Sequence, residues 1–175
     1  MSQAAQQDLA PGRAATIVAV AGGAAVFLLA SAALFNALVE GRPLPQGLRH
    51  GAVLAHPASV MLALPLGAAQ LLLPKGTVRH RVVGYVWIAL MVFTALASFA
   101  VHGLNPGGLS PIHGFSAATL VAAPLIVVFA RTGKVGRHRQ AALGLIIGGL
   151  VIAGLFTFLP GCILGDLAAR QSEAR

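Results

Sequence analysis

Acidic side chains are scarce in this sequence. Of its 175 residues only four are Asp or Glu, against twelve Lys or Arg, and charged residues make up 9% of the chain. A soluble globular domain carries about 25% charged residues. The four carboxylates lie near the termini or in one connecting segment, at Asp8, Glu40, Asp166 and Glu173. No long apolar run therefore contains a carboxylate, and nothing in the sequence is typical of a soluble domain.

Cysteine is nearly absent as well. The single residue Cys162 excludes an intrachain disulfide, and no CxxC or CxxCH motif exists for zinc or for covalent haem attachment. Ser59 and Ser116 each follow a histidine by three residues, but no carboxylate is placed to orient that histidine as a hydrolytic triad requires. The sequence therefore shows no hydrolytic or transferase site.

The net charge of +8 does not indicate a nucleic-acid partner. Phosphate binding needs a basic stripe on a soluble face, whereas the basic residues here form short clusters between apolar runs. A membrane protein acquires such clusters through the positive-inside rule. We therefore expect the partner to be the lipid bilayer and expect no nucleic acid.

Long apolar runs are abundant, and hydrophobic residues make up 57% of the chain. A helix needs about 20 apolar residues to cross a bilayer. Five runs reach or approach this length, and the first is too long for the core of a signal peptide, about 7–15 residues. We therefore predict an all-α integral membrane protein with five transmembrane helices. The runs are Ala14–Val39, Gly51–Leu73, Val82–His102, Ser110–Ala130 and Gln140–Leu159.

The distribution of Lys and Arg predicts an orientation. Segments 74–81 and 131–139, together with Arg13, hold eight of the basic residues, and the opposite side holds four. The richer side should be cytoplasmic, which puts the N-terminus inside and the C-terminus outside. The expected organisation is a cytoplasmic tail over 1–13, a peripheral helix over 14–39, a four-helix membrane core over 51–162 and a C-terminal tail over 163–175.

An internal repeat relates the second and third runs to the fourth and fifth. Each half opens on a histidine with a serine three residues later, at His56 and His113, and ends in Arg-His-Arg around His80 and His138. Pro-Leu lies in the middle of each first helix. The histidines are 24 residues apart in one half and 25 in the other. These matches together favour a four-helix bundle built from a duplicated helical hairpin.

The repeat predicts one histidine pair near each membrane surface, since the two histidines of each half are separated by one span. Two facing helices of a bundle can each give a histidine to one metal or haem iron. We therefore expect haem b, in one or two copies, held by His56 with His113 on the outer side and by His80 with His138 on the inner side. Such a protein would move electrons across the membrane and exchange them with a redox partner or a quinone.

Arginines flank these histidines and are expected to pair with haem propionates. Arg49 could serve the outer haem, and the four inner candidates are Arg79, Arg81, Arg137 and Arg139.

Two other interpretations stay open. In a non-haem subunit or scaffold, the histidines would only extend polar tips to the headgroups; this reading is preferred for His50, and His102 is undecided. A metal site or transporter is the other, because imidazole suits zinc, copper and iron and transporters often contain repeats. The absence of an acidic partner in any span counts against ion-coupled transport.

Three stretches carry a family resemblance: PKGT at 74–77 leading into HRVVGYVW at 80–87, LNPGGLSPIH at 104–113, and GLVIAGLFTFLPG at 149–161. They resemble an uncharacterised bacterial family of predicted membrane proteins, the domain-of-unknown-function family numbered twenty-three-oh-six. The resemblance covers about residues 50–162. It implies a location in the bacterial inner membrane and no particular activity.

The architecture is also similar to that of the ascorbate-reducible transmembrane cytochrome b family. In that family, histidines of the second and fourth core helices hold one haem and those of the third and fifth hold the other. The resemblance implies the pairs His56–His113 and His80–His138. The chain departs from the family because it has no ascorbate-binding motif and because its inner histidines lie nearer the loop.

Overall fold

The structure is a computed structural model that describes residues 13–39, 51–101, 113–159, 162 and 165. Every regular element within these residues is helical, and five helices are long and apolar enough to cross a membrane. This confirms the all-helical class and the five candidate spans. The elements are α2 (Arg13–Val39), α3 (Gly51–Leu72), α4 (Val78–Ser98), α5 (His113–Arg131) and a last helix made of α6 (Val135–Leu145), the π-helical η2 (Ile146–Ile152) and α7 (Ala153–Phe156).

Two helices begin earlier than their apolar runs predicted, at Val78 rather than Val82 and at Val135 rather than Gln140. The cap residue Thr77 explains the first of these, because its hydroxyl accepts the backbone N–H of His80 at 3.2 Å. Polar residues can continue a helix beyond the apolar core, since its backbone bonds are internal. His80 and His138 therefore lie in the first turns of helices and not in loops.

At the other end of the molecule, α3 begins at Gly51, so His56 lies in its second turn and not its first. Pro57 is the seventh residue of α3 and so lies inside the helix, where it cannot donate to the carbonyl four residues earlier. His113 lies at the start of α5, as expected. His50, His102 and Arg49 fall outside the described residues.

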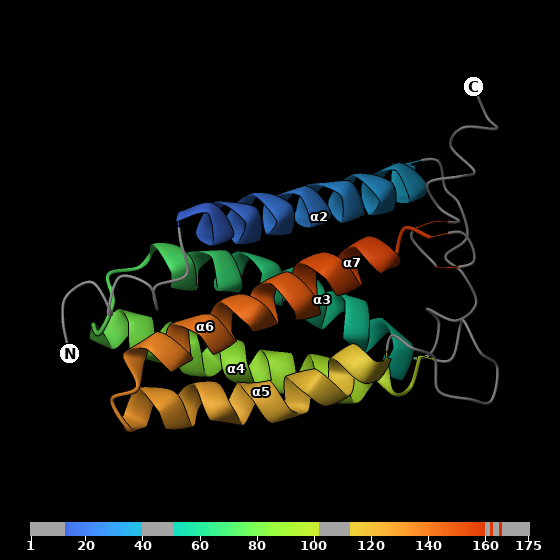
Figure 1. The fold of residues 1–175 in the computed structure, drawn as a ribbon. Helices are drawn as coiled ribbons and strands as arrows, with labels where there is room; N and C mark the ends of the chain where they lie inside the picture. Colours follow the sequence, from blue (N-terminus) through green and yellow to red (C-terminus); the bar gives the residue numbers. More distant parts are fainter. Residues whose placement is uncertain (1–12, 40–50, 102–112, 160–161, 163–164, 166–175) are drawn as a thin grey trace.

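Consecutive helices run antiparallel (Figure 1), and they share one buried core. The helix α3 packs on α4, α4 packs on α5, and α5 packs on α6, while η2 returns to contact α3. As a result α3 lies diagonally across from α5, and α4 lies diagonally across from α6. This order decides which histidines can meet.

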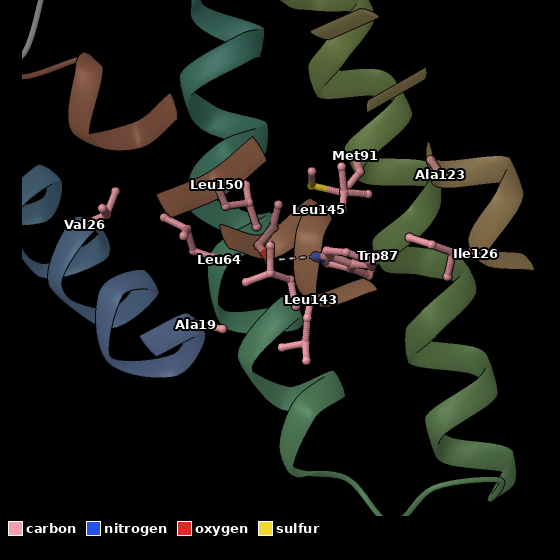
Figure 2. Close-up of a cluster of buried hydrophobic side chains, with 12 residues drawn as sticks. Ala19, Val26, Leu64, Trp87, Met91, Ala123, Ile126, Leu143, Leu145 and Leu150 are labelled. Carbon is pink, nitrogen blue, oxygen red and sulfur yellow. Dashed lines mark hydrogen bonds between the residues drawn. The ribbon is translucent and has the colours of Figure 1, made fainter. Parts of the chain in front are cut away.

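Trp87 occupies the centre of this core (Figure 2). Its indole N–H donates to the carbonyl of Ala63 on α3 at 3.1 Å, so its one polar atom is satisfied in an environment without water. The ring needs the space left by Gly67, where a Cβ would lie 3.0 Å from the indole nitrogen. Met91 and Leu150 complete the most deeply buried part of the core.

The helix α2 packs against α3 and η2 and is not merely peripheral. It buries Ala19 and Val26 in the shared core. Two glycines allow the approach: a Cβ at Gly22 would lie 2.8 Å from Val151, and one at Gly154 would lie 2.8 Å from Val26. Small residues at such a contact let helix backbones come close enough for dispersion forces to hold them.

We expect Gly154→Ala to weaken this contact. The added methyl overlaps a buried valine, so the variant should lose about 1–3 kcal/mol relative to a matched glycine-to-alanine change at an open position. Gly144→Ala is that control, since a Cβ there meets nothing within 4 Å. The free energy of unfolding in mixed detergent micelles measures both. Equal stabilities would show that α2 is not held by a close glycine contact.

Candidate functional site

One end of the bundle, which we call the basic end, brings together His80 of α4 and His138 of α6. Their ring centroids lie 6.4 Å apart with ring planes at 75°. The two residues are 58 positions apart in the sequence and come from helices on opposite corners of the bundle. The structure therefore brings these two histidines close together.

The ring nitrogens of this pair have different surroundings. The Nδ1–H of His138 donates to the carbonyl of Ile126 at 2.9 Å. That bond fixes the tautomer and leaves a lone pair on Nε2, as is usual for metal-binding histidines. Among the described residues, Nδ1 of His80 is buried and has no hydrogen-bond partner. An unsatisfied buried nitrogen costs about 1–3 kcal/mol, so this atom would gain from a ligand.

The backbone around His80 is held from α3. The side-chain amide of Gln70 donates to the carbonyl of His80 at 2.9 Å. The amine of Lys75 caps α3 through the carbonyls of Gln70 and Leu71. Partial burial, and secondarily the charge of Arg139, lower the pKa of the Lys75 amine. The first turn of α4 is thus anchored to the last turn of α3.

The spacing of the two rings suits one shared metal. Two imidazoles that bind a metal through their nearest nitrogens have centroids about 6 Å apart, since each metal–nitrogen bond is about 2 Å long. Small residues, Gly84 on α4 and Ala141 on α6, follow the two histidines by one turn. Ala141 also lines a groove of about 390 Å³ between α5 and α6–η2. The side-chain amide of Gln70 occupies the space beside Gly84, and the groove begins one turn beyond His138.

Four arginines flank the two histidines in the same helical turns and are exposed: Arg79, Arg81, Arg137 and Arg139. Arg81 donates to the carbonyl of Gly76 at 3.4 Å. The side chains of the other three make no hydrogen bond within the described residues. These positions leave guanidinium groups available for an acidic group such as a propionate.

The opposite end, which we call the serine-rich end, carries His56 and His113. Both side chains reach the last turns of α4: the Nδ1–H of His56 donates to the carbonyl of Thr94 at 3.0 Å, and the Nε2–H of His113 donates to that of Ser98 at 3.2 Å. The ring of His113 is 4% exposed and stacks on Phe99, with centroids 5.5 Å apart. These two histidines therefore bind the end of α4 from either side.

Hydroxyl groups connect the helices at this end. Thr94 donates to the hydroxyl of Ser59 at 2.8 Å, and the hydroxyls of Ser98 and Ser116 lie 2.5 Å apart. Ser59 in turn donates to the carbonyl of His56. The expected role of Ser59 and Ser116 in helix packing agrees with these bonds.

The residues that sequence reasoning missed are Thr94, Ser98 and Gln70. A signal for the first two exists, because Thr94 and Ser98 fall on the same helix face as Trp87 and Met91 and are buried with them. Polar side chains on the buried face of an apolar helix need partners on neighbouring helices. Gln70 could not be assigned in this way, since its acceptor is a main-chain carbonyl of the next helix.

Within the described residues, no third His, Cys or carboxylate joins either pair. A structural zinc site needs four protein ligands and a catalytic one needs three, so these residues do not build one. No protein-family model, curated protein or solved structure matches this chain. The geometry of the two histidine pairs is therefore what bears on their chemistry.

We expect Thr94→Val to destabilise the serine-rich end by about 1 kcal/mol, because it removes an interhelical hydroxyl bond in an apolar setting. Thr132→Val is the matched control: Thr132 is exposed and its hydroxyl bonds only within α5. That variant should stay within about 0.5 kcal/mol of wild type. Unfolding in mixed micelles compares them, and a Thr94→Val variant as stable as Thr132→Val would contradict the bonding described here.

Proposed function

We propose that this chain is a small integral membrane protein that transfers electrons through b-type haem, with His80 and His138 as axial ligands. One observation carries the proposal: two imidazoles from diagonal helices lie at the spacing that one iron requires. It is supported by the main-chain bond that leaves Nε2 of His138 as a donor to metal and by the unpartnered nitrogen of His80.

Haem bound through two histidines supplies a one-electron redox centre without an open position for substrate. The chain's own residues do the rest. The carbonyl of Ile126 orients the imidazole of His138 and makes it a stronger ligand. The apolar helices exclude water, and the exposed arginines beside the pair would bind the propionates. The expected role is therefore electron carriage, with a membrane quinone or another redox protein as partner.

A second haem between His56 and His113 would complete a path across the membrane. His56 fits a ligand role, because its Nδ1 is anchored on a carbonyl as in His138. His113 does not fit as it is placed, since its Nε2 donates to Ser98 and its ring stacks on Phe99. Ligation there requires the ring to turn and release Ser98. The proposal therefore stands on the basic end, and the ratio of haem to protein decides whether the serine-rich end adds a second site.

The proposed location is the inner membrane of a bacterium, with the basic end and the N-terminus in the cytoplasm. Five apolar helices support insertion. Every Lys and Arg that the structure describes lies at the basic end, which is the arrangement that the positive-inside rule favours for the cytoplasmic face. A duplicated hairpin is part of the same proposal: His56 corresponds to His113 in the two halves, and His80 corresponds to His138.

A second candidate is a non-haem membrane subunit or scaffold. One observation favours it: His56, His113 and His138 each donate to a main-chain carbonyl of a neighbouring helix. Histidines used in this way would be packing groups that join helices. This alternative leaves the buried nitrogen of His80 without a role.

We predict that wild-type protein, expressed with ample haem, shows a Soret band that shifts on reduction with dithionite. His80→Ala and His138→Ala should each lower the occupancy of the basic-end site at least about tenfold, since each removes a ligand. Total haem should then fall almost to zero if the protein binds one haem and to about half if it binds two. Absorbance spectra and a haem-to-protein ratio measure this. His113→Ala is the matched control at the other end: it leaves the ratio unchanged for one haem and halves it for two.

A folding defect is separated from ligand loss by rescue. His138→Gly leaves a space that free imidazole can fill, so added imidazole should restore the spectrum of a folded variant. Colourless wild-type protein would contradict the haem proposal and leave the scaffold function. Full haem content in both His80→Ala and His138→Ala would show that the basic-end pair is not the ligand set.

A further inference from the structure

The basic end carries a dense group of cations. Segments 75–81 and 131–139 contain seven Lys and Arg residues, and all seven are exposed. We call these seven side chains the basic belt. All four carboxylates of the chain fall outside the described residues. Within the described part of the chain, the belt therefore has no acidic side chain to balance it.

The two segments form one surface. Contact between the rings of His80 and His138 joins them at the centre. The charge of Arg139 acts on Lys75, which connects α6 with the segment before α4. On another side, Nε of Arg131 donates to the phenol oxygen of Tyr85 at 3.3 Å, and its guanidinium lies 5.9 Å from the centre of that ring. The belt thus spans the ends of several helices.

The bonds that belt residues make position their charges without neutralising them. Lys75 and Arg81 donate to main-chain carbonyls, and Arg131 donates to a neutral phenol. The side chains of the remaining four belt residues make no hydrogen bond within the described residues. Positive charges this close repel one another unless anions lie between them.

We propose that the basic belt binds the phosphates of anionic glycerophospholipids. This inference rests on the membrane insertion in the proposed function but not on haem. Five of the seven belt residues lie in the terminal turns of the candidate spans, and Lys75 and Lys134 lie just beyond the span ends, which is the depth of lipid headgroups. Tyr85, beside Arg131, is an aromatic residue of the kind found at membrane interfaces. Exposed apolar side chains such as Val82 and Val135 adjoin the belt and would contact the acyl chains.

A bound haem would not supply enough negative charge to balance the basic belt. Its propionates would neutralise only part of the belt. They would pair with the arginines beside His80 and His138, and the belt contains other cations as well. Arg131 and Lys134, at the end of α5 and in the following turn, would still face the headgroups.

The test uses the full chain in nanodiscs, where both leaflets have the same lipid and orientation does not matter. Relative to phosphatidylcholine alone, phosphatidylglycerol should raise the Tm by at least about 3 °C at low salt. High salt should abolish the rise, because it screens exposed charges. Arg131→Gln should lose more of the rise than Arg13→Gln, a control with the same charge change at the same end but outside the belt.

Several results would overturn the inference. They are an equal Tm in both lipids, an unchanged rise at high salt, equal losses in Arg131→Gln and Arg13→Gln, or the same rise from inorganic phosphate added to phosphatidylcholine discs. If Arg131→Gln does not fold, the salt series on wild-type protein gives the answer. The spectrum of each sample reports haem separately, so a lipid effect in colourless protein would support the belt while the haem proposal fails.

Discussion

The supply of hydrogen-bond acceptors inside an apolar bundle decides how its histidines are arranged. No carboxylate lies in any described helix, so an imidazole there must use a main-chain carbonyl of a neighbouring helix. His138 takes that of Ile126, and His56 takes that of Thr94. Each bond fixes one ring nitrogen as a donor and thereby selects the nitrogen that remains for a metal. The two ends therefore differ in which ring nitrogen stays available for a metal. At the serine-rich end, Nε2 of His113 already donates to the carbonyl of Ser98.

The order in which the helices pack decides which histidines lie close together. Trp87 joins α4 to α3 through its hydrogen bond to Ala63. On the outer side of the last helix, α2 packs closely through the glycine contacts. With α4 and α6 at opposite corners, the rings of His80 and His138 in their first turns come to 6.4 Å between centroids. A π-helical stretch interrupts the last helix at residues 146–152, and π-helical turns often accompany functional sites. Here it carries Gly149, whose missing side chain admits Met91 and Thr119.

Sequence patterns predicted the helices well because apolar length alone identifies a span. They placed the starts of α4 and α6 too late, because hydropathy does not register polar first turns. Thr77 caps the first turn of α4, and Lys134 at the start of α6 makes no side-chain cap. The matched Arg-His-Arg and His-Ser spacings also predicted which two histidines lie at each end of the bundle. They could not choose between ring nitrogens, since the bonds to Ile126 and Ser98 depend on packing between distant segments. The orphaned nitrogen of His80 was equally invisible in the sequence.

The most direct test of the central claim is electron paramagnetic resonance of oxidised, haem-replete protein at low temperature. Two imidazoles on one iron give a low-spin ferric centre. This low-spin signal should persist in His113→Ala. A high-spin ferric signal, or none at all from protein expressed with ample haem, would contradict ligation by His80 and His138.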